Sequence, residues 1–198
     1  TPDYIVNLIL DFGGYNSSEI LKKHVIDNSC GDGAFLVEIV NRYCSTFLQT
    51  SNDISLLREE LETYIHGIEL DEVECKSCIK NLHQITDKYG VKDINWNILN
   101  ADTLTIDQFN GKMDFVFGNP PYVRVHNLET SYDSVKKFKF AKDGMTDLFI
   151  VFFEIGFKML AKEGVMCLIT PSSWLSSLAG KTLREYIFLY HNLSGVID

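Results

Sequence analysis

Apolar runs of strand length alternate with longer helical patterns along most of this chain. This alternation is typical of an α/β fold built on a mostly parallel sheet. Strands are predicted at His24–Asn28, Tyr64–Leu70, Ile94–Leu99, Met113–Phe117, Gly164–Thr170 and Leu193–Asp198. Helices are predicted at Pro2–Phe12, Gly33–Leu48, Ile54–Glu62, Asp71–Tyr89, Thr146–Ala161 and Ala179–Tyr190. Several of the strands are nearly continuous apolar runs, as expected for parallel strands that are buried on both faces.

The chain has 198 residues, enough for one sizeable domain with its own core. No internal repeat and no linker rich in Pro or Gly divides it, so residues 1–198 are predicted to form a single domain. The first residue is not Met, and we expect a piece of a longer protein. No apolar stretch reaches eighteen residues, so no membrane span is expected.

The five cysteines are an odd number at scattered positions, which favours reduced thiols and a cytoplasmic protein. Cys75 and Cys78 form one CxxC pair inside a predicted helix. A zinc site would need two further ligands at suitable spacing, and none stands nearby. The pair is interpreted as two ordinary helix cysteines, and no metal is expected.

The formal net charge of −9 argues against a general nucleic-acid binder, because affinity for DNA depends heavily on Lys and Arg that neutralise phosphates. One segment, Val123–Lys142, has a local excess of three positive charges. It is either a solvated charge run or a set of phosphate contacts. The candidates for phosphate contacts are Arg124, Lys136, Lys137 and Lys139.

A glycine loop follows the first predicted strand, which ends at Asp27. Gly31 and Gly33 allow a tight turn and a close approach of the backbone to a ligand. The next helix begins there with free N–H groups, which favour a carboxylate or a phosphate. The loop lacks the third glycine of a dinucleotide site and the Lys-Ser/Thr of a phosphate loop, which argues against a nucleoside triphosphate.

Acidic residues end the next two strands. Glu69 follows the second strand and can accept hydrogen bonds from both hydroxyls of a ribose, whereas Asp71 is interpreted as a helix cap. Asp102 follows the third strand and can accept from the amine of an adenine. Each carboxylate alone could be an ordinary loop residue, but together with the glycine loop they indicate an adenosine ligand.

The fourth strand runs into Asn119-Pro120-Pro121-Tyr122. The two prolines fix the backbone and remove two N–H donors while their carbonyls remain as acceptors. Asn119 adds a side-chain oxygen, and Tyr122 adds an aromatic face. Two acceptors beside a stacking surface suit a planar heterocycle that carries an amino group, although a plain Pro-Pro turn is the alternative.

These residues resemble the amino-methyltransferases of DNA, and specifically the N6-adenine enzymes of restriction–modification systems. The Asn119–Tyr122 tetrapeptide is similar to their catalytic motif, and Asp27–Leu36 to their cofactor loop, Asp-Pro-x-Cys-Gly-x-Gly-x-Phe. The resemblance adds Cys30 and Phe35 to the cofactor residues, while Asn28 departs from the usual Pro. It also adds Thr1, because Thr1-Pro2 is similar to the Thr-Pro segment that contacts the methionine part of the cofactor. That segment precedes the glycine loop, which implies the gamma-type motif order.

The resemblance covers nearly the whole chain and is strongest to type IIG restriction–methylation polypeptides. Thr146–Phe149, Gly164–Trp174 and Leu183-Arg184 carry it downstream. It implies a Rossmann-like S-adenosylmethionine-dependent fold whose C-terminal hairpin lies outside this chain. It also implies that double-stranded DNA is bound through a recognition domain outside the chain, with a nuclease or specificity module fused or as a partner.

The implied reaction is direct transfer of a methyl group from S-adenosylmethionine to the N6 amino group of a flipped adenine in DNA. An N4-cytosine target, an RNA adenine and the glutamine amide of a release factor pose the same chemical problem and stay open as alternatives. So does a scaffold that binds the cofactor without catalysis.

Overall fold

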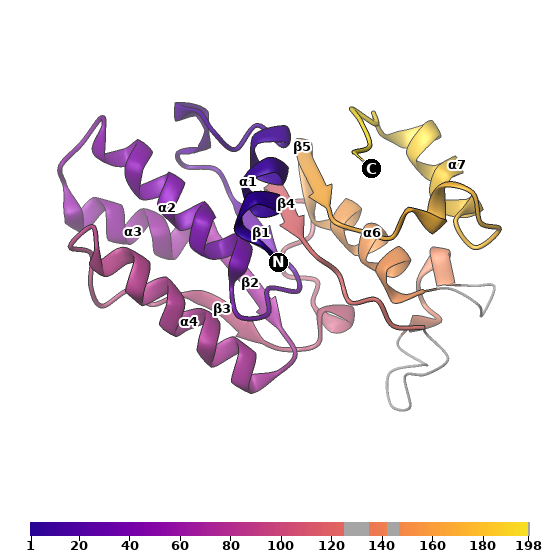
Figure 1. Cartoon of the computed structure of the whole chain (residues 1–198), viewed down its shortest axis with the longest axis horizontal. Helices are drawn as coiled ribbons and strands as arrows, with labels where there is room; N and C mark the ends of the chain where they lie inside the picture. The colour runs from indigo at the N-terminus through magenta and orange to yellow at the C-terminus, as the bar shows by residue number, and fades with distance from the viewer. Residues whose placement is uncertain (125–134, 142–146, 198) are drawn as a thin grey trace. The chain divides into compact units, whose positions relative to one another are not determined.

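The computed structural model describes residues 1–124, 135–141 and 147–197. The chain forms a five-stranded sheet in the order β3-β2-β1-β4-β5 (Figure 1). All four strand pairs are parallel, which confirms the predicted α/β class. The strands are β1 (Val25–Asp27), β2 (Ile65–Glu69), β3 (Asn97–Asn100), β4 (Met113–Gly118) and β5 (Leu160–Leu168).

The register of the sheet brings the ends of separate strands to one edge. Asp27, the last residue of β1, is opposite Gly67 on one side and Phe117 on the other. Glu69 ends β2 opposite Asn100, which ends β3. Because parallel strands all point the same way, the segments that follow them emerge together, as in other open α/β sheets that bind ligands there.

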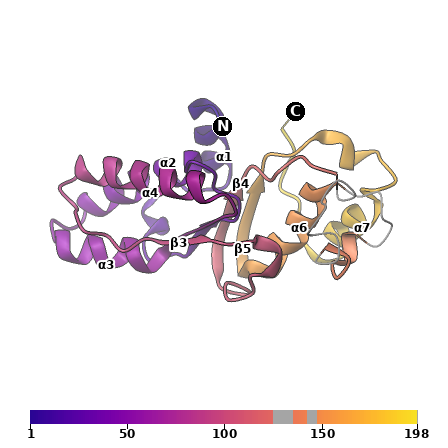
Figure 2. The same ribbon diagram turned by 90° about the horizontal axis from the view of Figure 1, so that it is seen from below.

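Four α-helices precede β3 in the chain. They are α1 (Asp3–Phe12), α2 (Ala34–Leu48), α3 (Ile54–Tyr64) and α4 (Glu72–Asp87). Helices α1, α2 and α4 pack side by side (Figure 2). Apolar side chains at helical spacing along α2, such as Leu36, Ile39 and Tyr43, are fully buried. Asp71 caps α4 through bonds from the N–H groups of Val73 and Glu74, as predicted.

The chain divides into two compact units. The sheet unit contains residues 1–119 and 159–168, and the C-terminal unit contains residues 120–158 and 169–198. The C-terminal unit holds α6 (Leu148–Met159, as far as Lys158), α7 (Lys181–Tyr190) and two short 3-10 helices, Lys139–Ala141 and Ser172–Leu175. Aromatic rings pair within it, among them Phe153 with Trp174 and Phe157 with His191, whose ring centroids are 5.4 and 4.1 Å apart.

The strand predicted at Leu193–Asp198 is wrong over residues 193–197, and Asp198 lies outside the described residues. The segment contains the apolar residues Leu193, Val196 and Ile197, but their side chains are all more than half exposed. No strand pairs with it in the part of the chain that the structure describes. Without a neighbour to accept its backbone hydrogen bonds, an apolar pattern alone does not make a strand.

The remaining elements are where the sequence predicts them, with shifted ends. The last strand of the sheet, β5, begins at Leu160, four residues before its predicted start, and the helix predicted at Thr146–Ala161 is α6. Thr146 lies outside the described residues. None of the described helices combines the length and the apolar character that crossing a membrane requires.

Candidate cofactor and catalytic site

The loop after β1 has the conformation that its glycines predict. Gly31 and Gly33 have φ angles of +52° and +92°, which side-chain-bearing residues rarely adopt. The loop is tied to the neighbouring strand because the Cys30 N–H donates to the Ile68 carbonyl at 3.0 Å. Gly33 caps the N-terminus of α2, so the free N–H groups of that helix begin at the loop.

Glu69 holds the same loop from the end of β2. One carboxylate oxygen accepts from the Gly31 N–H, and the other accepts from the Asp71 N–H, each at 2.8 Å. The sequence predicts only a ribose acceptor at Glu69. In the structure the side chain also sets the shape of the glycine loop, and each oxygen has a second lone pair for a ligand hydroxyl.

Asp27 is almost completely buried at the end of β1, with 2% of its surface exposed. Its carboxylate accepts from the Ser29 N–H at 3.0 Å. Burial raises the pKa of Asp27 to about 7, the Ser29 N–H opposes that rise, and the negative charge of Glu69 adds to it. A carboxylate of this kind is poorly solvated, and a cation placed against it would favour its ionised form.

The close packing beside Asp27 requires a glycine that sequence reasoning missed. A Cβ atom at Gly118 would lie 2.8 Å from the Asp27 carboxylate oxygen Oδ1. No local pattern marks this glycine, because its φ is not in the left-handed region and the clash is with a side chain 91 positions away in the sequence. Its only sequence signal is its place directly before Asn119.

Asp102, Cys30 and Phe35 have local roles in the structure. The Asp102 carboxylate accepts from the Leu104 N–H at 2.9 Å and so caps the short helix Thr103–Thr105. Thr103 donates its hydroxyl to the carbonyl of Asn28 at 2.7 Å, which ties the end of β3 to the end of β1. The side chains of Cys30 and Phe35 are buried in the core. Cofactor contacts by these three residues stay a prediction.

Asn119 lies directly after β4 and joins the end of β1. The Ser29 hydroxyl donates to its backbone carbonyl at 3.4 Å. Its side-chain Nδ2 donates to the hydroxyl of Thr1, also at 3.4 Å. The sheet unit therefore brings together Thr1, Asp27 and Asn119, which the sequence assigns separately to cofactor binding and catalysis.

The rest of the tetrapeptide belongs to the C-terminal unit, where Pro120 is buried and Pro121 is half-buried. Tyr122 is 53% exposed although it is held at two points. Its hydroxyl donates to the Ile169 carbonyl at 3.2 Å, and its ring meets that of Phe149 edge-on at 6.4 Å. A ring that is fixed in place and still exposed is suited to stacking against a planar group.

All four basic candidates for phosphate contacts are exposed, as such contacts require. Arg124 forms an antiparallel β-bridge with Asp147, and the Lys137 ammonium lies 5.2 Å from the centroid of the Phe138 ring. Glu129 and Asp133, the two acidic residues of the Val123–Lys142 segment, lie outside the described residues, and so does Lys142.

Replacement of Gly33 by Ala should destabilise the loop more than the same change at Gly31. Both glycines have positive φ, which costs an alanine about 1–2 kcal/mol. A Cβ at Gly33 would also lie 2.8 Å from the Cys78 sulfur, whereas nothing lies within 4 Å of one at Gly31. Denaturant titration of the two variants should show a difference of roughly 1–3 kcal/mol in the free energy of unfolding. Equal losses would contradict the steric account.

The curated relatives that this chain matches include type II methyltransferases. It is 29% identical over 211 residues to the type II methyltransferase M.BstVI of Geobacillus stearothermophilus, and the match covers all of this chain. The chain spans 37% of the length of that relative.

The solved structures that resemble it define the class of fold. A protein of Listeria monocytogenes described as a class I S-adenosylmethionine-dependent methyltransferase superposes with a TM-score of 0.68 at 16% identity, over 95% of this chain and 51% of the other. A nuclease-deletion mutant of the type ISP restriction–modification enzyme LlaGI, solved with a DNA substrate mimic, superposes with a TM-score of 0.71 at 16% identity, over 95% and 22%. The fold is therefore the Rossmann-like fold of S-adenosylmethionine-dependent methyltransferases.

The family follows from the sequence. Residues 34–198 match the model of the Eco57I restriction-modification methylase family. This chain belongs to that family.

Proposed function

We propose that residues 1–198 are the catalytic domain of a restriction–modification enzyme that transfers a methyl group from S-adenosylmethionine to the N6 amino group of adenine in DNA. The observation that carries the proposal is the contact between the segments that follow β1 and β4. Asn119, the amine acceptor, is hydrogen-bonded through its carbonyl to Ser29 of the glycine loop. An acceptor for the target amine thus adjoins the loop that would hold the methyl donor.

The residues present fit this cofactor. S-adenosylmethionine carries an ammonium and a sulfonium, and the buried Asp27 carboxylate is a suitable partner for a cation. The open space at Gly31 and the α2 N-terminus suit its carboxylate. Glu69 would accept from the ribose hydroxyls, and Asp102 from the adenine amine.

The protein's part in the reaction is to orient the target amine. The lone pair of an exocyclic amine is delocalised into its ring, which makes the nitrogen a poor nucleophile. Hydrogen bonds from its two N–H groups to the Asn119 side chain and the Pro120 carbonyl would turn the lone pair out of the ring plane. S-adenosylmethionine, when bound, would supply a methyl group on a sulfonium that becomes a neutral thioether, and the methylated amine would release its extra proton to water. Alignment of the amine by Asn119 and Pro120 would therefore do most of the work.

A comparison of substrates tests the proposal. The full-length protein that contains this chain is incubated with isotopically labelled S-adenosylmethionine and, separately, with duplex DNA, RNA or a release factor. We expect label in DNA alone, and N6-methyladenine after digestion to nucleosides. N4-methylcytosine, labelled RNA or labelled release factor would each contradict the proposal and support the alternative with that substrate. If no substrate is labelled, the scaffold that binds the cofactor without catalysis is the alternative that remains.

Binding to DNA should depend on the exposed basic residues of the C-terminal unit. Phosphate contacts carry no sequence information, so Lys136→Gln should weaken binding to all duplexes alike. The slope of the logarithm of the binding constant against the logarithm of the salt concentration should become shallower by about the contribution of one phosphate contact. Lys92→Gln, at another exposed lysine in the sheet unit, is the matched control. Titration of labelled duplexes at several salt concentrations measures both. An unchanged slope in Lys136→Gln would remove that residue from the DNA contacts.

A further inference from the structure

The first helix begins beside the amine acceptor. The Thr1 hydroxyl accepts from Nδ2 of Asn119, 118 residues away in the sequence. Pro2 caps α1, and its carbonyl accepts from the N–H groups of Ile5 and Val6. Thr1 is therefore attached to the start of a regular helix. The position of α1 determines the position of the Thr1 hydroxyl.

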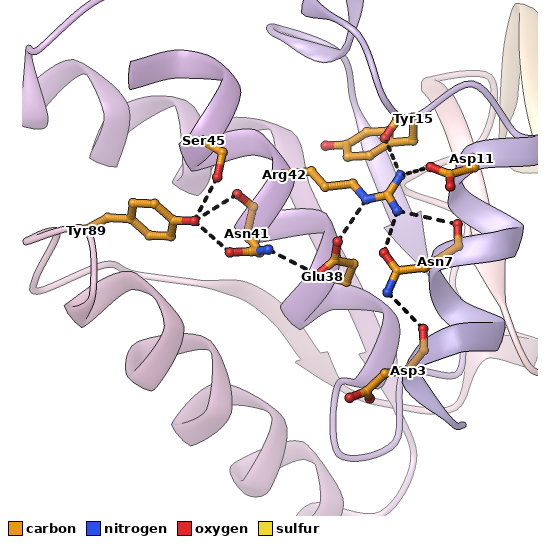
Figure 3. Close-up of polar contacts among 9 residues, drawn as sticks. All are labelled: Asp3, Asn7, Asp11, Tyr15, Glu38, Asn41, Arg42, Ser45 and Tyr89. Carbon is orange, nitrogen blue, oxygen red and sulfur yellow. Dashed lines mark hydrogen bonds and ion pairs between the residues drawn. The ribbon is translucent and has the colours of Figure 1, made fainter. Parts of the chain in front are cut away.

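Arg42 of α2 fastens α1 along its polar face (Figure 3). Its guanidinium donates to the Asp11 carboxylate at 2.6 Å and to the Tyr15 carbonyl at 3.1 Å through one nitrogen. The other terminal nitrogen donates to the Asn7 side-chain oxygen at 2.7 Å, and Nε donates to Glu38 at 2.9 Å. The planar fork of an arginine fixes the direction of each of these bonds.

The contacts of Arg42 continue to the first turn of α1. Asn7 accepts from Arg42 and donates its own Nδ2 to the Asp3 carbonyl at 2.9 Å, two residues from Thr1 (Figure 3). Val6 and Leu10 bury the other face of α1, but apolar packing is not directional. The polar contacts therefore set the rotation of the helix and its position along its axis.

We propose that Thr1 is a positioning residue that orients the Asn119 amide, and that Arg42 holds α1 where Thr1 can do so. An amide that donates through Nδ2 carries its oxygen on the other side of Cγ, so the bond to Thr1 favours the orientation in which that oxygen faces away from Thr1. The flipped amide would present N–H donors to the N–H donors of the target amine, and loss of the Thr1 hydroxyl removes an acceptor that favours the productive orientation. This inference rests on the proposed function, in which the Asn119 oxygen accepts from the substrate.

Two substitutions at Thr1 in the full-length enzyme test the role. Thr1→Val keeps the shape and removes the hydroxyl, whereas Thr1→Ser keeps the hydroxyl. We expect Thr1→Val to lower the single-turnover rate of methyl transfer about 3- to 10-fold, which matches the net loss of one hydrogen bond. Cofactor affinity by calorimetry should stay within about twofold, and Thr1→Ser should restore the rate. A loss of cofactor affinity at an unchanged rate would overturn the proposal and make Thr1 a direct cofactor contact.

A double-mutant cycle tests the part assigned to Arg42. Arg42→Lys loses the planar fork, and if it acts through the Thr1–Asn119 bond, the double variant with Thr1→Val should be no slower than the slower single variant. Multiplied rate losses would show two independent effects and overturn this part. Tyr89→Phe is the matched control, because it removes bonds to Asn41 and Ser45 at the end of the same network remote from α1, and its rate should not change (Figure 3).

A spectroscopic measurement separates this inference from the proposed function. In protein labelled with nitrogen-15 asparagine, the side-chain NH₂ signal of Asn119 is identified by its absence in Asn119→Ala. The signal should move in Thr1→Val and stay in place in Thr1→Ser whether or not any substrate is methylated. An unmoved signal in Thr1→Val would overturn the orienting bond even in an active enzyme, whereas inactivity of the wild type with a moved signal would count only against the proposed function.

Discussion

Replacement of Asn119 by Ala should lower the turnover number about 100- to 1,000-fold while cofactor affinity stays within about twofold. The Asn119 oxygen is proposed to accept from the target amine as its nitrogen becomes tetrahedral, and an interaction made mainly in the transition state lowers kcat when it is lost. The magnitude is that measured when one preorganised hydrogen-bonding group of an active site is removed. Single-turnover methyl transfer and calorimetry with S-adenosylmethionine measure the two quantities.

The matched control for this change is Asn119→Asp, which keeps the length of the side chain and an acceptor oxygen. It should retain more of the rate than Asn119→Ala, because the side chain still presents an acceptor oxygen to the target amine. Melting temperatures of both variants check that the sheet unit is intact. Near wild-type turnover in Asn119→Ala would remove Asn119 from the chemistry and leave the proposed mechanism without its acceptor.

Replacement of Asp27 by Asn should weaken cofactor binding and stabilise the free protein at alkaline pH. The proposed cationic partner loses a charge-assisted hydrogen bond worth about 1.5–3 kcal/mol, which corresponds to roughly a 10- to 100-fold weaker affinity. The variant keeps a side-chain oxygen for the Ser29 N–H. In the wild type, affinity should rise as pH increases through about 7, where the carboxyl group ionises, and the variant should lack that rise.

The effect on stability follows from the direction of the pKa shift. Burial raises the pKa of Asp27 in the folded protein to about 7 from 3.8, so the protonated carboxyl is the form that the fold prefers. The contribution of the protonated Asp27 carboxyl to the free energy of unfolding is fully present below about pH 4. It is lost as the pH rises through about 7. Asp27→Asn has no charge to bury and should exceed the wild type by a few kcal/mol at pH 8, on the order of the shift itself.

Denaturant titrations of the wild type and Asp27→Asn at pH 4 and pH 8 measure this difference. Asp107→Asn, which removes an exposed carboxylate from the same unit, is the control. If Asp27→Asn gains nothing at pH 8, the carboxylate is better stabilised in the folded protein than its burial implies. A gain together with unchanged cofactor affinity would place the cationic ligand elsewhere.

Much of the sheet could be predicted because its signals are local. Several of the parallel strands are short apolar runs bounded by polar residues, and the sequence predicts a strand at each of the five positions of the sheet. The same signal is wrong at 193–197, where an apolar pattern has no partner strand in the described residues. A strand depends on hydrogen bonds to another segment, and its own composition does not show whether that segment is present.

The sequence by itself determined which side chains stand at the strand ends. Asp27 and Glu69 end their strands, the two glycines lie in the loop after β1, and Asn119 directly follows β4. The positive φ angles of Gly31 and Gly33 agree with their residue type. The tertiary structure alone decided the partners: Thr1 for Asn119, Gly31 for Glu69, and Gly118 against Asp27. Strand register and helix rotation set these contacts to within an ångström or so, and both depend on packing between segments far apart in the sequence, which no local pattern encodes.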